Sequence, residues 1–347
     1  MSLAASIQNS ERNNLQFTIE NRSTNTVSST DFEIIKLKQA VKEFTKLEQE
    51  VGDFSTVYSR MISETHNLMA AIRKCQLAGM RREEILEFMN GPRRIYRRSH
   101  FVARVQDWVR GYPGDFETVE YICDGVNRVS DSDLLGYCVE DYSLNGRIAQ
   151  QHRNKVQLQA NQIYKICLEK ENAQILSIGC GGARDLRLIS DLLEKTSATF
   201  VLCDSDADAL ECARINLGKI ADRCTFVQGK VPRVVNKLKS YGNFDLVVAG
   251  GLFDYLPERW IELVLSEIWQ NMLNPAGKIF FTNIARGNPY NTLIEYFCDW
   301  ILIERDEDDI KNLCRAVSVE EFLVMYRDTT NLTIISEITK PAFKENN

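Results

Sequence analysis

The sequence is poor in the residues from which metal centres are built. It contains three histidines, His66, His100 and His152, which lie far apart along the chain, and its ten cysteines form no Cys-x-x-Cys pair. Structural zinc sites draw on closely spaced cysteine and histidine ligands. We therefore expect no metal ion.

The sequence also lacks a basic excess and a long apolar run. Lysine and arginine total 42 against 48 aspartate and glutamate, a formal net charge of −6. A net negative charge does not attract a polyanion such as a phosphate backbone, so we expect no nucleic-acid partner. No apolar run approaches the roughly 20 residues of a membrane-spanning helix. The start of the sequence lacks the positively charged region and apolar stretch of a secretory signal peptide, so we expect a cytoplasmic protein with reduced thiols. The expected partner is a small molecule. The sequence does not indicate an oligomeric state.

Three regions differ in residue pattern. Residues 1–29 are rich in Asn, Ser and Thr without periodic apolar residues, which predicts a disordered tail. Residues 30–170 carry apolar side chains at helical spacing after a capping box at residues 30–33, which predicts a helical lid or substrate domain. Residues 171–347 alternate short β-branched runs with amphipathic segments, the pattern of βαβ units around a parallel sheet.

Six strands and four helices are predicted in the last region. The strands are expected at residues 175–178, 199–203, 225–227, 246–249, 278–282 and 332–335. The helices are expected at residues 183–194, 206–217, 258–272 and 290–303.

A glycine-rich turn follows the first predicted strand. Gly179, Cys180, Gly181 and Gly182 stand between residues 175–178 and the next helix. Glycine lets the backbone bend sharply and lets a ligand approach the main chain beside the helix start. A nucleotide-like cofactor fits this place, and a tight turn without a ligand is the alternative.

An aspartate ends the second predicted strand. Asp204 comes a little over 20 residues after the glycine turn, where doubly wound folds place an acid against ribose hydroxyls. The short Gly-x-Gly-Gly turn suits S-adenosylmethionine (SAM), which has no pyrophosphate, better than a dinucleotide. The alternative role for Asp204 is to cap the next helix.

Two later strand ends carry further candidates. Gly229 and Lys230 follow the third strand, and Gly250 and Gly251 precede Phe253, Asp254 and Tyr255 after the fourth. Aromatic faces attract a sulfonium cation by roughly 0.5 to 2 kcal/mol per contact. Core packing is the alternative for Phe253, and a plain turn is the alternative for the two glycines.

A loop with glycine, proline, aromatic and charged residues interrupts the helical region at residues 110–116, Arg-Gly-Tyr-Pro-Gly-Asp-Phe. Such loops often serve function. The alternative is a structural corner between helices in which Arg110 and Asp115 pair with each other.

The chain resembles the class I SAM-dependent methyltransferases that make the extracellular factor, a 3-hydroxy fatty acid methyl ester. The resemblance rests on residues 110–116, Gly146-Arg147, the glycine turn, residues 251–256 (Gly-Leu-Phe-Asp-Tyr-Leu), Asn288-Pro289, residues 294–296 and Asp299-Trp300. It spans about residues 110–305. The turn departs from the family, which would carry Ala-Cys-Gly-Pro-Ala-Arg at residues 179–184.

The resemblance implies an α/β fold, a Rossmann-like seven-stranded class I methyltransferase sheet with an N-terminal helical lid domain. The seventh strand comes from the family alone. SAM is the expected cosubstrate. The residues expected to bind it are Arg110, Gly179, Gly181, Asp204, Ser205, Gly229, Lys230, Gly250, Gly251 and Phe253. The expected catalytic residues are Tyr112, Asp115, Asp254 and Tyr255.

Two reactions are open at this stage. The first is methyl transfer to a small acceptor of secondary metabolism, such as the carboxylate of a hydroxy acid, which needs positioning and no strong base. The second is cyclisation of SAM to azetidine-2-carboxylate with release of methylthioadenosine, since SAM-cyclising enzymes also resemble this chain. An amine nucleophile must first lose a proton, for which Asp115, Asp254 or Tyr255 is the candidate acceptor. Two further functions stay open, a SAM-binding protein without catalysis and a NAD-dependent oxidoreductase.

Overall fold

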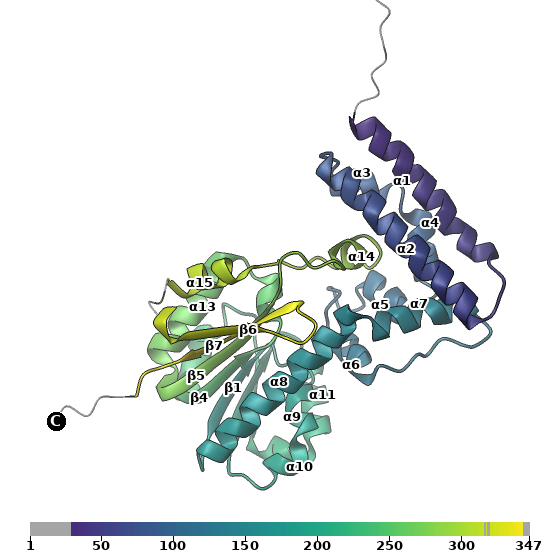
Figure 1. The fold of residues 1–347 in the computed structure, drawn as a ribbon. Helices are drawn as coiled ribbons and strands as arrows, with labels where there is room; N and C mark the ends of the chain where they lie inside the picture. Colours follow the sequence, from purple (N-terminus) through teal and green to yellow (C-terminus); the bar gives the residue numbers. More distant parts are fainter. Residues whose placement is uncertain (1–28, 316, 318–319, 343–347) are drawn as a thin grey trace, which may run out of the picture.

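A computed structural model describes residues 29–315, 317 and 320–342. The tail expected at residues 1–29 lies outside this range except for its last residue. Helices dominate residues 29–169 and a mixed sheet with flanking helices follows (Figure 1).

The sheet has seven strands in the order β3-β2-β1-β4-β5-β7-β6. β1 to β5 are parallel, β7 runs antiparallel to β5, and β6 runs antiparallel to β7. The strands are β1 (Gln174–Ile178), β2 (Thr199–Asp204), β3 (Cys224–Gln228), β4 (Phe244–Ala249), β5 (Leu273–Ile284), β6 (Leu323–Arg327) and β7 (Thr333–Thr339). The expected seven-stranded class I fold is confirmed. β6 is the strand that the sequence pattern did not reveal.

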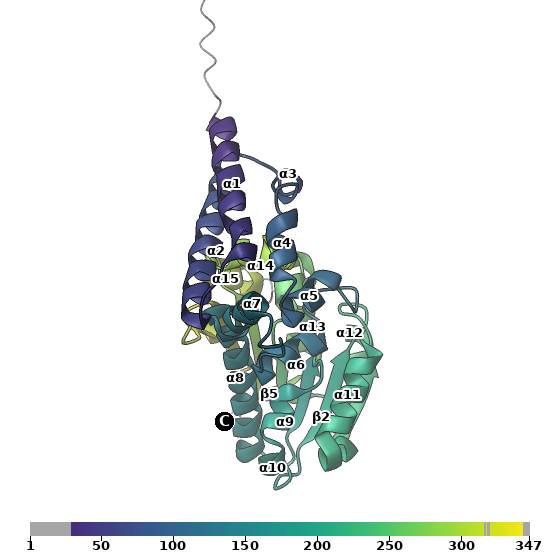
Figure 2. The ribbon, with the colours of Figure 1, turned by 90° about the vertical axis from the view of Figure 1, so that its right-hand side faces the viewer.

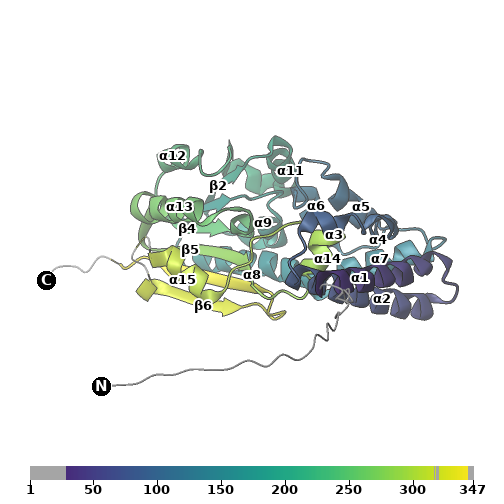
Figure 3. The same cartoon turned by 90° about the horizontal axis from the view of Figure 1, so that it is seen from above.

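Helices cover both faces of the sheet (Figure 3). One face packs against α8 (Arg147–Glu169), α9 (Arg184–Leu188), α10 (Ser190–Leu193) and α11 (Ala207–Leu217). The other face packs against α12 (Val235–Leu238), α13 (Glu258–Asn271) and α15 (Glu307–Arg315). All residues of β4 are buried, as a continuous apolar run in a central parallel strand predicts. Short 3-10 helices occur at η1 (Lys46–Gln49), η2 (Gly218–Arg223), η3 (Lys239–Tyr241), η4 (Leu252–Tyr255) and η5 (Glu320–Phe322).

The N-terminal helices form a second core of their own. They are α1 (Ser29–Thr45), α2 (Phe54–Leu77), α3 (Arg82–Leu86), α4 (Asn90–Tyr96), α5 (His100–Asp107), α6 (Phe116–Asp124) and α7 (Leu134–Asn145). α1 and α2 pack along each other at the end of the molecule far from the sheet (Figure 2). We call this core, with the α14 segment described next, the helical region.

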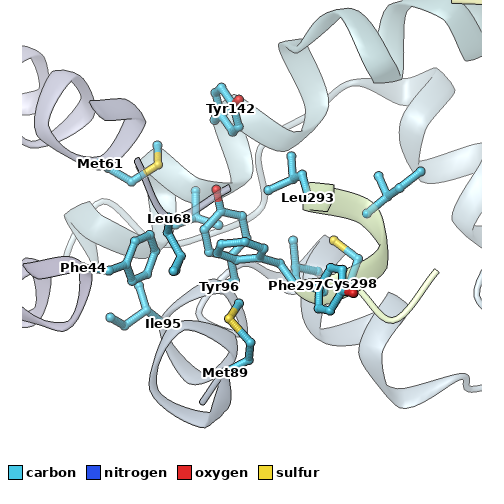
Figure 4. Close-up of a cluster of buried hydrophobic side chains, with 14 of the residues drawn as sticks. Phe44, Met61, Leu68, Met89, Ile95, Tyr96, Tyr142, Leu293, Phe297 and Cys298 are labelled. Atoms are coloured by element: carbon cyan, nitrogen blue, oxygen red, sulfur yellow. The ribbon is translucent and has the colours of Figure 1, made fainter. Parts of the chain in front are cut away.

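A segment from the C-terminal half completes that second core. α14 (Asn291–Tyr296) lies against α2, and the ring of Phe297 lies 4.6 Å from that of Tyr96 and 5.8 Å from that of Phe44 (Figure 4). Leu293 and Cys298 are buried in the same cluster. The helical region is therefore built from two separate stretches of the chain.

Three expectations need correction. The helix expected at residues 290–303 ends at Tyr296, because the backbone turns at Asp299, whose φ is +59°. The helix expected at residues 183–194 divides into α9 and α10 at Ile189. α8 falls within the expected lid of residues 30–170 but packs on the sheet, against β4, β5 and α9.

Candidate functional site

A pocket of about 1070 Å³ lies between the carboxyl ends of the parallel strands and the helical region. Open α/β sheets bind ligands at this edge. Its lining comes from the loops after β1, β2, β3 and β4, from residues 109–122, from α8 and from the stretch around Trp300.

The glycine turn forms the floor of the pocket. Gly179 and Gly181 have φ angles of +69° and +52°, a region that favours glycine. The Gly179 and Cys180 amides donate to the Cys203 carbonyl at 2.8 and 3.1 Å. The turn is thereby tied to the end of β2.

Asp204 is held by backbone amides at the end of β2. Its Oδ2 accepts from the Gly181 amide at 2.8 Å and its Oδ1 from the Asp206 amide at 3.0 Å. The side chain lines the pocket and is 8% exposed, and burial raises its pKa while the amide donors oppose the shift. Each carboxylate oxygen has lone pairs left for ligand hydroxyls. The arrangement fits the ribose of SAM, and Asp206, not Asp204, caps α11.

The loop after β4 approaches α8 closely. A Cβ on Gly250 would lie 2.0 Å from Nε2 of Gln159, so any other residue here would displace that side chain. Gly251 has a φ of +84° and donates its amide to the Thr282 hydroxyl at 2.9 Å.

Phe253 corrects one sequence expectation. It is 1% exposed, its ring lies 5.2 Å from that of Phe281, and it belongs to the core beneath the sheet rather than to the pocket lining. Core packing was the alternative for this residue. It follows from η4, which turns Phe253 inward and its neighbour Tyr255 toward the pocket.

Tyr112 and Tyr255 form an aromatic pair in the pocket. Their ring centroids are 6.5 Å apart in an edge-to-face arrangement, and the Tyr255 hydroxyl accepts from the indole of Trp300 at 2.8 Å. Gly114 lies against Tyr255 and Trp300, since a Cβ there would come within 1.9 Å of the Tyr255 hydroxyl and 2.9 Å of the Trp300 ring. Residues of the 110–116 loop therefore line the pocket next to Tyr255.

Two charged residues of that loop have partners other than each other. Arg110 donates to both oxygens of Asp206, at 2.6 and 2.9 Å, and also to Asp208. Asp115 caps α6 through the Thr118 amide and binds Arg104 at 2.8 and 2.9 Å. Arg110 lines the pocket and Asp115 does not, because Arg104 and the α6 amide hold its carboxylate away from it.

Asp254 is buried beside the pocket. Its Oδ1 accepts from the Ile284 amide at 2.6 Å and its Oδ2 lies 3.4 Å from Nζ of Lys155. Burial raises its pKa and the Lys155 ammonium opposes that shift.

Most of the predicted residues meet in the pocket. Besides those placed above, Ser205, Gly229 and Lys230 line it. Sequence reasoning missed the wall formed by α8, where His152, Lys155 and Gln159 face the pocket. Their spacing of three and four residues puts them on one helix face, next to the buried Val156 and Ala160. A polar stripe inside an apolar helix face was the signal that could have revealed them.

The described residues contain neither a membrane-spanning helix nor a metal-binding cluster. No helix in the ranges given above is long and apolar enough to cross a membrane. The same part of the chain holds no group of three or more His, Cys, Asp or Glu side chains placed to bind a metal ion.

Comparisons with known proteins point to one domain family. Residues 175–277 match the model of a methyltransferase domain. No curated protein matches the chain. The structure of a "possible exported protein" from Bordetella parapertussis is similar with a TM-score of 0.54 at 13% identity, over 90% of this chain and 96% of that one.

Two solved methyltransferases are similar over somewhat more than half of this chain. Magnesium protoporphyrin IX methyltransferase from Synechocystis PCC 6803 with bound S-adenosylhomocysteine (SAH) has a TM-score of 0.41 at 12% identity, over 56% of this chain and 87% of its own. The N-methyltransferase NodS from Bradyrhizobium japonicum WM9 has a TM-score of 0.36 at 12% identity, over 54% and 97%.

The segment that matches the methyltransferase domain begins in β1 and ends in β5. It contains the glycine turn, Asp204 and Gly250, which face the pocket together. The chain carries a class I methyltransferase domain and is an enzyme, a SAM-dependent transferase.

Proposed function

We propose that this enzyme transfers the methyl group of SAM to a small acceptor that has an apolar body and a carboxylate, such as a hydroxy acid of secondary metabolism. The size and lining of the pocket carry the proposal. Its volume, about 1070 Å³, is at the upper end of the roughly 300–1,000 Å³ typical of pockets for one drug-sized ligand. SAM and a second small molecule can therefore share it.

The part of the pocket away from the strand ends supports an apolar acceptor. It is lined by apolar side chains from α5, α6, α8, α14 and the segment after α14, namely Phe101, Ile122, Ile148, Ala149, Ile294, Cys298 and Leu302. An acyl chain would gain roughly 0.8 kcal/mol for each methylene group that it buries there. The resemblance to the hydroxy fatty acid methyltransferases is consistent with this lining.

The residues of the strand ends would hold SAM. Asp204 would accept hydrogen bonds from the ribose, and the methionine tail would lie along the Gly250-Gly251 turn, next to Gln159 and Lys155. When bound, SAM supplies an activated methyl group on a sulfonium. The chain itself then has to orient the acceptor and exclude water, which the loop of residues 110–116 would do.

Cyclisation of SAM is the second candidate, and the aromatic pair favours it. Tyr112 and Tyr255, with Trp300 beside them, place aromatic rings in the pocket, and the face of such a ring attracts a cation. In that reaction the amine of SAM, after losing a proton, bonds to Cγ, the Cγ–S bond breaks, and methylthioadenosine leaves. Asp254, whose pKa is raised by burial, is the candidate proton acceptor near this pair.

The products distinguish the two reactions. The pure enzyme is incubated with SAM alone and with SAM plus 3-hydroxy acids of increasing chain length, and the products are identified by mass spectrometry. We expect SAH and a methyl ester only when an acid is present, with the matching primary amides as controls. Methylthioadenosine and azetidine-2-carboxylate from SAM alone would reverse the assignment.

A further inference from the structure

An ammonium group is buried in the pocket wall at the middle of α8. The side chain of Lys155 is 5% exposed, and the same helix face carries the buried apolar residues Val156 and Ile163. A charge taken out of water is costly unless partners compensate it. A buried lysine at a pocket therefore needs a full set of partners.

The chain gives Lys155 an incomplete set. Among the residues that the structure describes, Asp254 is its one hydrogen-bond acceptor, at the long distance of 3.4 Å. The other oxygen of Asp254 is held by the Ile284 amide. An ammonium has three N–H donors, so two remain for the pocket that Lys155 lines. Gly251 lies directly beside the ammonium, since a Cβ there would come within 3.2 Å of Nζ, closer than ordinary contact.

The other cationic side chains that line the pocket either have carboxylate partners or are exposed to solvent. Arg110 is engaged by Asp206 and Asp208, and Arg184 by Glu120 and Asp124. Lys230 is exposed at the pocket rim. Among the buried and partly buried cations that line the pocket, Lys155 therefore has the fewest N–H donors bound by described residues.

His152 lies one helical turn before Lys155 on the same wall. Its ring is partly buried and lines the pocket, and burial together with the charges of Lys155 and Arg153 holds its pKa well below the usual range. A neutral imidazole donates one hydrogen bond and accepts another, so it can bind a hydroxyl beside a charged group.

We propose that Lys155 is the carboxylate-binding residue of this pocket and that His152 binds a polar group next to that carboxylate. The proposal rests on the proposed function, since the pocket must hold SAM and an acid. Both the methionine tail of SAM and the acceptor carry a carboxylate, so the ligand chemistry is the same and the experiment identifies its source.

The variants are chosen to keep buried charge balanced. Lys155→Met alone would leave Asp254 buried without its cation, so the main variant is Lys155→Met with Asp254→Asn. The matched control is Lys170→Met, which breaks an ion pair with Asp245 (2.7 Å) at the end of the same helix, outside the pocket lining. Asp245 keeps two other hydrogen-bond donors there, the Gln174 amide and the Asn274 side chain, so it is not left without partners.

Calorimetry then compares each acid with its carboxamide. One arm uses SAH and the carboxamide of SAH. The other uses the enzyme loaded with SAH and adds 3-hydroxyoctanoate or 3-hydroxyoctanamide. We expect the wild type and Lys170→Met to favour the acid about 10- to 100-fold in one arm, and the double variant to lose that preference. If the preference for the acid is lost in the SAH arm, the carboxylate is that of the methionine tail. If it is lost in the 3-hydroxyoctanoate arm, the carboxylate is that of the acceptor.

The proposal is overturned if the wild type binds acid and carboxamide equally in both arms, or if the double variant keeps the preference. The wild-type comparison holds even if the double variant does not fold. It is also independent of the reaction: if SAM alone yields methylthioadenosine while the SAH arm responds to the double variant, the proposed function fails and the carboxylate site stands.

Discussion

The two walls of the pocket differ in what they present to a ligand. The strand-end wall contains the glycines of the turns after β1 and β4 and the carboxylate of Asp204, which is fixed by the Gly181 amide. The opposite wall presents side chains from α8 and the helical region, among them His152, Lys155 and Tyr112. Backbone geometry follows from the fold, whereas side chains vary freely on it. We therefore expect the strand-end wall to bind SAM and the opposite wall to determine the reaction and the acceptor.

The largest expected effect tests whether Phe253 belongs to the hydrophobic core or to the strand-end wall of the pocket. Phe253→Ala should lower the free energy of unfolding by about 3–5 kcal/mol, because it removes a ring from the core beneath β4 and β5. Chemical denaturation measures this. Tyr255→Phe is the comparison, and it should cost about 1 kcal/mol at most, the value of one hydrogen bond with Trp300. A stable Phe253→Ala protein that fails to bind SAH would put Phe253 in the pocket instead.

The next effect tests the principal carboxylate of the strand-end wall. Asp204→Ala should weaken SAH binding by roughly 10- to 100-fold in a folded protein, since each hydrogen bond to a charged acceptor is worth about 1.5–3 kcal/mol. Calorimetry is the measurement, and Asp222→Ala, at an exposed carboxylate after α11, is the control. Unchanged SAH affinity in Asp204→Ala would mean that the ribose lies elsewhere.

The smallest effect concerns the ion pairs that join the two walls at the lid. Arg110 binds Asp206 and Asp208, and Glu120 of α6 binds Arg184 and Arg187. Partly exposed pairs are worth up to about 1 kcal/mol each and weaken with salt. We expect Arg110→Gln, or a rise in salt from about 0.05 to 0.5 M, to speed SAH release a few-fold in stopped-flow experiments.

The matched control for the lid is Arg97→Gln, which breaks the Arg97–Asp107 pair within the helical region. It should leave the release rate as it is. Equal rates in Arg110→Gln and the wild type at every salt concentration would show that this pair does not hold the lid.

The two walls also differ in how well they could be predicted from the sequence. The glycine turn and Asp204 were recognisable because each lies at the end of a local apolar run, where spacing along the chain decides the structure. β6 was missed because it is a short edge strand with alternating burial, Leu323–Arg327, next to residues without a clear pattern.

The missed side chains depend on contacts that no local pattern encodes. Lys155 meets Asp254 across 99 residues of sequence, and Gln159 covers Gly250 from another element. Phe253 and Tyr255 are two residues apart and of similar type, yet η4 sends one into the core and the other to the pocket. Such assignments require the tertiary fold.

The segment between β5 and α15, which leaves the sheet and packs in the helical region, has a consequence for the order in which the two cores can fold. The chain leaves the sheet after Ala285, reaches the helical region with α14 and Phe297, and returns at Arg305, which pairs with Ala285. Phe44, made early in synthesis, is packed against Phe297, made late. Domains generally fold in sequence from the N-terminus during translation. Here α1 and α2 leave the ribosome well before Phe297, which packs in their core, so completion of that core must wait for the C-terminal half of the sequence.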